Sequence, residues 1–111
     1  EPLEVFGDGN QGRDFFYIED CAEFVAKACF SEKAVGQIFN AGYGKEVKIK
    51  NLAEKIAGGK AEIKFINHHH PHAEVMNMCA DSSKAEKTLN WKPKISLEEG
   101  INKTAQWLKN K

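Results

Sequence analysis

Apolar residues recur at helical spacing in three long stretches of the chain. In the first and in the second, over residues 49–57, they stand at positions i, i+3, i+4, i+7 and i+8, and the third, over residues 97–108, carries a similar helical stripe at i, i+4, i+7, i+8 and i+11. Such spacing predicts amphipathic helices that each bury one face. The stripe positions are Cys21, Phe24, Val25, Ala28 and Cys29; Ile49, Leu52, Ala53, Ile56 and Ala57; and Leu97, Ile101, Thr104, Ala105 and Leu108.

Capping signals set the expected ends of these helices. Asp20 with Glu23, and Ser96 with Glu99, have the spacing of a capping box before the first and the third helix. The second helix lacks this signal, because Lys48 stands at its N-cap and offers no acceptor. We expect its first turn to fray, at about 1 kcal/mol relative to a good cap. The pair Gly58-Gly59 is expected to end it.

Four shorter runs predict strands, and one short segment predicts a further helix. The strand candidates are rich in β-branched and aromatic residues or alternate in polarity, and they cover residues 13–18, 37–40, 61–66 and 75–79. Asp81 is expected to cap a short helix that buries Ala85 and Leu89, and Trp91 is expected to anchor the corner that follows it. The chain is therefore predicted to be a mixed α/β piece with a short sheet and about four helices.

Composition excludes several classes of function. Sixteen basic and sixteen acidic residues leave no net charge to recruit nucleic acid, and no apolar run is long enough to cross a membrane. With 41% hydrophobic content, the 111 residues can form one core. Three cysteines without a C-x-x-C pair indicate neither a disulfide framework nor a zinc ribbon, and they fit a cytoplasmic protein. Cys21 and Cys29 are expected in the core rather than as nucleophiles.

The glycine-rich stretch Gly7-Asp8-Gly9-Asn10-Gln11-Gly12 carries the first candidate chemistry. It matches the dinucleotide pattern G-x-G-x-x-G, but a strand rather than a helix is predicted after it, so a strand, turn, strand unit is the favoured interpretation. The turn is followed directly by Arg13, whose planar guanidinium can bind a phosphate through two hydrogen bonds. The alternative is that Arg13 pairs with Asp8, Asp14 or another surface carboxylate.

Four motifs in order carry a family resemblance. Residues 7–20 resemble the G-D-G-x-Q-x-R-D-F-x-Y-V-x-D segment of the NAD-dependent nucleotide-sugar epimerases and dehydratases, the extended short-chain dehydrogenase/reductase family. Residues 39–44 are similar to its F-N-x-G-x-G, residues 80–85 to its A-D-x-S-K-A, and residues 89–100 to its L-G-W-x-P-x and L-E-E-G. The resemblance spans nearly the whole chain, but it does not identify the sugar or the reaction.

The same resemblance implies that the chain is the C-terminal part of such an enzyme, without the N-terminal Rossmann core. The family needs a tyrosine followed four residues later by a lysine, whereas Tyr17 is followed there by Cys21 and Tyr43 by Val47. No catalytic residue is therefore expected here. We expect residues 1–111 to form a single substrate-binding fragment, with residues 19–44 completing the edge of the missing cofactor domain and residues 45–111 forming a substrate lobe.

The histidine tract at residues 67–72 allows two interpretations. His68 and His70 would point to one side of an extended chain, with Glu74 as a third ligand for zinc, but no cysteine completes the set and no metal is predicted. Relatives of the resembled family carry R-P-G-E or R-P-G-D here. By that resemblance Glu74 keeps the acidic end, and His70 or His72 stands near the place of an arginine that clamps the diphosphate.

The resemblance also implies the function. The chain is expected to bind a nucleotide-diphosphate sugar for an NAD-dependent epimerase of the 4-epimerase type that acts through a keto-sugar intermediate. NAD would be bound by the full-length enzyme and not by this piece alone. The expected substrate-binding residues are Gln11, Arg13, Asn40, His70, His72 and Glu74, although Asn40 has an alternative role as a turn residue. The alternatives are part of a 4,6-dehydratase, or a stand-alone binding domain without an enzyme. A homo-oligomer is expected.

Overall fold

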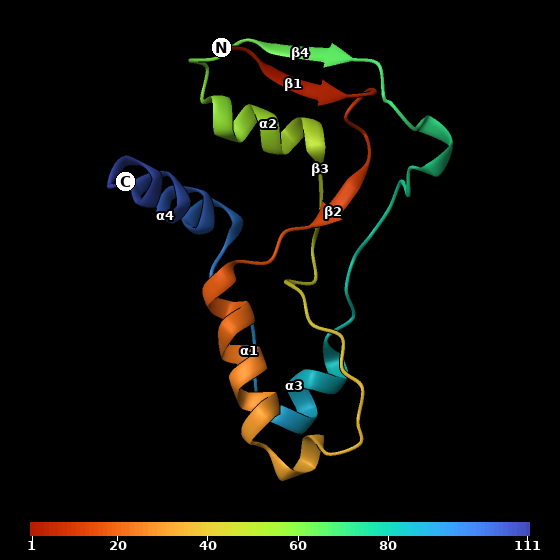
Figure 1. Cartoon of the computed structure of the whole chain (residues 1–111), viewed down its shortest axis with the longest axis vertical. Helices are drawn as coiled ribbons and strands as arrows, with labels where there is room; N and C mark the ends of the chain where they lie inside the picture. The colour runs from red at the N-terminus through yellow and green to blue at the C-terminus, as the bar shows by residue number, and fades with distance from the viewer. The chain divides into compact units, whose positions relative to one another are not determined.

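The computed structural model describes all of residues 1–111 and contains four α-helices, two short 3-10 helices and four short strands (Figure 1). The predicted fold class, a small α/β piece with four helices and short sheets, is confirmed. The chain divides into two compact units, and each of them combines separate parts of the sequence. Unit 1 is Glu1–Arg13 with Glu46–Cys79, and unit 2 is Asp14–Lys45 with Ala80–Lys111.

A parallel strand pair and one helix form unit 1. Strand β1 (Leu3–Phe6) pairs with β4 (Ile63–Ile66). Helix α2 (Ile49–Ala57) contacts both strands, and its Ala53 and Ala57 are buried together with Val5 of β1. Strand β3 (Glu46–Lys48) leads into α2 and pairs with β2 (Gly12–Asp14), and the 3-10 helix η2 (Pro71–Ala73) follows β4.

Both ends of α2 are well defined. As predicted, the helix stops at Gly58, which adopts the left-handed conformation with a φ of 52°. Lys48 provides no side-chain cap, but the expected frayed start is wrong. The backbone N–H of Ile49 donates to the carbonyl of Gln11 (3.0 Å), and that of Lys50 to the carbonyl of Gly9 (2.9 Å). The glycine-rich loop therefore caps α2 with its own backbone.

The core of unit 2 forms around Trp91. The unit contains α1 (Ile18–Phe30), the 3-10 helix η1 (Glu32–Ala34), α3 (Ser83–Leu89) and α4 (Leu97–Lys109). Side chains from α1, η1 and α3 contribute to this core, but none from α4. Ala85 and Leu89 of α3 are buried with Trp91, as predicted. The Trp91 ring meets Phe16 edge-on at 5.6 Å and Phe24 of α1 at 5.2 Å. The aromatic corner therefore joins α1 to the segment after α3.

Two capping predictions have different outcomes in unit 2. Ser96 caps α4 as predicted, because its hydroxyl accepts the N–H of Glu99 (3.2 Å). The capping box of Asp20 is wrong, since α1 begins two residues earlier at Ile18 and its N-cap, Tyr17, makes no side-chain bond. Asp20 is instead buried, and its carboxylate accepts the N–H groups of Lys94 (3.0 Å) and Ile95 (2.9 Å).

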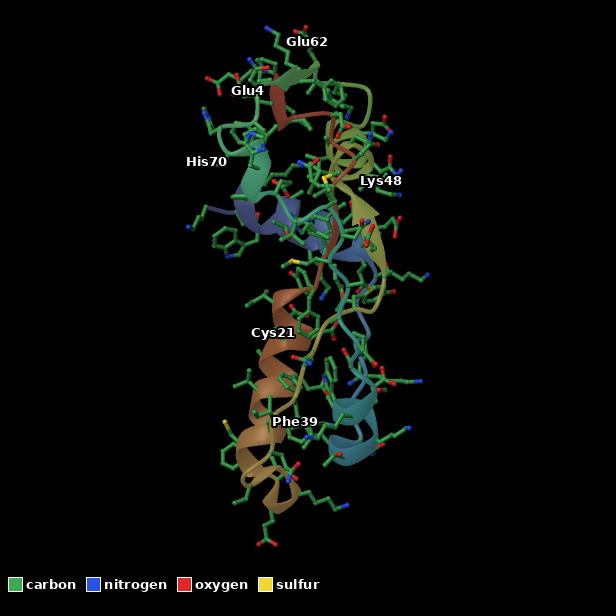
Figure 2. All side chains as sticks on the ribbon, turned by 90° about the vertical axis from the view of Figure 1, so that its right-hand side faces the viewer. Glu4, Cys21, Phe39, Lys48, Glu62 and His70 are labelled. Atoms are coloured by element: carbon green, nitrogen blue, oxygen red, sulfur yellow. The ribbon has the colours of Figure 1, made fainter.

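Several expected strands are shorter than predicted or do not form. Residues 15–17 are irregular, residues 37–40 form no strand, and within 75–79 only an isolated bridge joins Asn77 to Gly12. A strand needs a neighbour to bond with, and the ladders within this chain use other segments. On α1, Cys21 and Phe24 are partly buried, but Val25 and Cys29 are exposed, so the expected core position of Cys29 is wrong and the stripe is only partly covered within this chain. Cys21 and Phe39 mark the helix and the segment after it in Figure 2.

Candidate functional site

The glycine-rich loop is shaped by its own backbone and by α2. Gly7 and Gly9 have φ values of 69° and 70°, in the left-handed region that glycine tolerates. A Cβ atom on Gly9 would lie 2.8 Å from the Cβ of Lys50, so only glycine lets the loop approach the helix this closely. The Asp8 carboxylate accepts the backbone N–H and the side-chain amide of Asn10, both at 2.9 Å, and these bonds lower the pKa of Asp8.

Gln11 is the best-buried of the expected binding residues. It is 8% exposed, and its amide Nε2 donates to the carbonyl of Phe6 at 3.0 Å. That bond ties the end of β1 to the far side of the loop. The side chain therefore supports the loop from inside unit 1.

Strand β2 connects this loop to the segment after η2. The N–H of Gly12 donates to the carbonyl of Met76 (2.6 Å), and the N–H of Met78 donates to the carbonyl of Gly12 (3.2 Å). Glu46 of β3 lies where a Cβ of Gly12 would be, and it accepts a hydrogen bond from Asn77 (2.7 Å). Residues 74–78 are thereby held beside Arg13.

Arg13 has a fixed orientation. Its Nη1 donates to the carbonyls of Gly12 (2.8 Å) and Val75 (2.6 Å), and its Nη2 donates to the carboxylate of Glu74. Its side chain is 28% exposed. Three of the five guanidinium donors are used in this way, which leaves the Nε donor and one Nη2 donor. A guanidinium can use two such donors to bind two oxygens of a phosphate.

Glu74 and His68 complete a chain of polar contacts with Arg13. Glu74 offers one carboxylate oxygen to Arg13 and the other to Nε2 of His68, at 2.5 Å. The Glu74 side chain is 17% exposed and that of His68 is 22% exposed. Arg13 pairs with Glu74, a carboxylate other than Asp8 and Asp14, which were named as its expected partners. The cluster of Arg13, Glu74 and His68 lies entirely within unit 1.

His70 and His72 are not part of the hydrogen-bonded cluster of Arg13, Glu74 and His68. His70 immediately precedes η2, where Figure 2 labels it, and His72 lies within that turn; both are exposed. The chain contains no group of three His, Cys, Asp or Glu side chains placed to hold a metal ion. The tract therefore presents exposed imidazoles at η2 and directly before it.

In unit 2 the residues around Asn40 form a tightly bonded turn. The Asp14 carboxylate accepts the N–H groups of Tyr43 (3.0 Å), Gly44 (2.9 Å) and Ala80 (3.1 Å). The Ser82 hydroxyl accepts the N–H of Gly42 (2.9 Å). Asn40 itself is exposed. The turn is thus built by other residues, and it leaves the Asn40 side chain accessible to solvent.

The six expected binding residues fall into both units. Five of them lie in unit 1, where Arg13 and Glu74 are in direct contact, and Asn40 lies in unit 2. Sequence reasoning did not assign the supporting roles of Asp14 and Ser82, although both stand inside matched motifs. It grouped His68 with Glu74 only as possible zinc ligands and did not count His68 among the binding residues, although the two are in direct contact.

The sequence profile described as GDP-mannose 4,6 dehydratase matches residues 1–104. UDP-glucuronate 4-epimerase of Thermodesulfobacterium geofontis is 42% identical over 98% of this chain and 34% of its own length. The X-ray structure of Pal from Bacillus thuringiensis has a TM-score of 0.95 and 48% identity, and the match covers 98% of this chain and 35% of that one. A further similar structure is UDP-glucuronic acid 4-epimerase from Bacillus cereus in complex with UDP-glucuronic acid and NAD, with a TM-score of 0.84 and 34% identity. That match covers 99% of this chain and 36% of the epimerase chain.

The chain therefore spans about a third of the length of the relatives it matches. None of its helices combines the length and the apolar character that crossing a membrane requires.

Proposed function

The chain belongs to the GDP-mannose 4,6 dehydratase family, and from that membership we propose that it forms the nucleotide-diphosphate-sugar-binding part of an NAD-dependent sugar epimerase. The observation that carries the proposal is Arg13, held by three acceptors on a glycine-shaped loop with its Nε donor and one Nη2 donor left for an anion. A 42% identical relative named as a UDP-glucuronate 4-epimerase supports a uridine nucleotide sugar as the ligand.

The reaction we propose belongs to the whole protein. NAD would supply reversible hydride transfer at a sugar carbon, with the hydroxyl proton passing to and from a general base, so that a keto sugar forms and is reduced again on its opposite face. Residues 1–111 contain no Tyr-x-x-x-Lys pair, so their part is to hold the diphosphate and to place the hexose. We assign substrate contacts to Arg13, Asn40 and Glu74, with His70 or His72 near the diphosphate and Gln11 supporting the loop.

The proposed organisation assigns one part of the chain to cofactor binding and another part to substrate binding. Residues 19–44 would complete the edge of a cofactor-binding domain, and residues 45–111 would form the substrate lobe. The exposed apolar side chains of α1 fit a helix that packs against further protein. We further propose that the whole protein is a cytoplasmic homo-oligomer.

A 4,6-dehydratase is the second candidate, favoured by the description of the family itself. Incubating the intact protein with NAD and UDP-glucose or UDP-glucuronic acid distinguishes the two by nuclear magnetic resonance of the product. An epimerase yields a C4 epimer of the same mass from either substrate, whereas a dehydratase acting on UDP-glucose yields a 4-keto-6-deoxy sugar that is lighter by one water; UDP-glucuronic acid has no 6-hydroxyl to eliminate. Absence of both turnover and binding would favour the third candidate, a binding domain without an enzyme.

A further inference from the structure

The protonation pattern of His68 can be determined from its two ring contacts. Its Nδ1 accepts the backbone N–H of His70 at 2.9 Å. A backbone amide only donates, so Nδ1 carries no proton, and the ring proton of the neutral imidazole lies on Nε2. That nitrogen is 2.5 Å from Oε2 of Glu74, and His68 is therefore the donor in this contact.

The contact at Nδ1 also ties the tautomer of His68 to the turn that follows it. A proton on Nδ1 would face the N–H of His70 and remove the hydrogen bond that holds the start of η2. The groups that face the ring are the Glu74 carboxylate, the His70 backbone and the Phe6 ring of β1, at 6.0 Å between ring centroids. Phe6 also packs at 5.1 Å against His69, which limits rotation of the neighbouring rings.

Because His68 donates to Glu74, both carboxylate oxygens of Glu74 have a partner. Oε2 is engaged by His68, so Oε1 is the oxygen that faces Nη2 of Arg13. Together with the carbonyls of Gly12 and Val75, this contact sets the plane of the guanidinium. Its remaining donors can bind an anion without first losing rotational freedom, which is the advantage of a preorganised site.

We propose that His68 is a positioning residue for anion binding: as a neutral Nε2–H donor it holds Glu74, and Glu74 in turn orients Arg13 toward a nucleoside diphosphate. The inference rests on the proposed function, since it takes Arg13 as the group that binds the diphosphate. His68 does not touch the ligand in this scheme.

Two substitutions separate the two contacts of the ring. His68→Asn keeps an acceptor near the position of Nδ1 and loses the donor to Glu74, whereas His68→Gln keeps a donor near the position of Nε2 and loses the acceptor. Calorimetry with UDP on the intact protein at pH 8 is expected to show about tenfold weaker binding for His68→Asn and a change within about twofold for His68→Gln. Equal affinities of the two variants would overturn the proposal.

A double-mutant cycle tests the route through Glu74. In a Glu74→Gln background, His68→Asn is expected to have no further effect on UDP affinity, because the carboxylate that it positions is gone. Additive losses would mean that His68 acts elsewhere. If the variants fail to fold, the ring nitrogen chemical shifts of His68 in the unaltered protein still decide the case, since a proton on Nδ1 contradicts the assigned tautomer.

The variant Arg13→Ala separates the positioning role of His68 from the proposed function, in which Arg13 binds the diphosphate. If Arg13→Ala binds UDP as tightly as the unaltered protein, the proposed function fails and the inference fails with it. If Arg13→Ala weakens binding while His68→Asn leaves it unchanged, Arg13 binds the diphosphate and only the role of His68 is overturned.

Discussion

Arg13 has two roles. It forms an ion pair with Glu74, and it is the residue proposed to bind the diphosphate. In the intact protein, Arg13→Ala is expected to weaken nucleotide-sugar binding by about 1.5 to 3 kcal/mol, the range for a hydrogen bond to a charged group. Isothermal titration calorimetry with UDP-glucuronic acid measures the loss. The melting temperature should change little in comparison, because the side chain is partly exposed.

A matched control for that substitution is Lys33→Ala, which also removes one positive charge but from an exposed position on η1. Its affinity for the nucleotide sugar should equal that of the unaltered protein. If both variants lose affinity equally, the effect comes from net charge, and Arg13 returns to the role of a surface ion pair.

The exposed histidines give a separate expectation. If His70 or His72 replaces an arginine at the diphosphate, affinity for the nucleotide sugar should rise as pH falls from about 8 to 6, because only the protonated imidazole adds a positive charge. Titrations at several pH values with the unaltered protein and with a His70→Gln, His72→Gln double variant test this. A profile that is the same for both proteins removes these two residues from the site.

Sequence reasoning identified Arg13 and Glu74 but not their contact. The two are 61 residues apart, and nothing local in either segment indicates which carboxylate will meet the guanidinium. The pairing depends on the bridge between Gly12 and Asn77, which is tertiary. His68 was considered only as a possible zinc ligand beside Glu74, because its tautomer depends on the local turn at residues 68–73, which brings the N–H of His70 to Nδ1.

Among the elements, α1 depends on a buried carboxylate rather than on a conventional cap. Asp20 is 2% exposed and accepts two backbone N–H groups from the segment before α4. Asp20→Ala leaves both donors without their partner and is expected to lower the free energy of unfolding by about 3 kcal/mol. Urea denaturation followed by circular dichroism measures the change.

The neighbouring Glu19→Ala serves as the control for Asp20→Ala. Glu19 is mostly exposed and only pairs with Lys103 on α4, so its removal should cost less than about 1 kcal/mol. Similar losses for the two variants would show that Asp20 contributes no more than a surface charge.

Helices were predictable where their signals are local. The stripe and glycine stop of α2, and the Ser96 cap of α4, are contained within a few residues each. The strands at 37–40 and 75–79 were predicted wrongly because pairing depends on segments far away in the sequence. The frayed start of α2 was wrong for a related reason, since its first N–H groups find carbonyls of the glycine-rich loop about 40 residues earlier.

Taken as a whole molecule, the chain buries few large apolar side chains. Val5, Leu89 and Trp91 are the only buried hydrophobic residues larger than alanine. Unit 2 exposes Phe30, Val35 and Ile38, with Phe30 at 92% exposure, and unit 1 exposes Ile56 and Phe65. Apolar surface of this kind gains free energy when another protein surface covers it.

The 111-residue chain on its own is therefore expected to self-associate. Exposed apolar side chains occur along α1 and the irregular segment 37–40, and the backbone of that segment, which joins no β-ladder of this chain, can pair with another copy. Analytical ultracentrifugation over a range of concentrations should show species larger than a monomer, and Phe30→Ser with Ile38→Ser should shift the distribution toward the monomer. A sharp monomer at high concentration contradicts this expectation.

The isolated chain should also turn over no UDP-sugar with added NAD. Neither of its tyrosines has a lysine four residues later to assist the proton transfer. Product formation by these residues alone would mean that a different pair of groups performs the proton transfer.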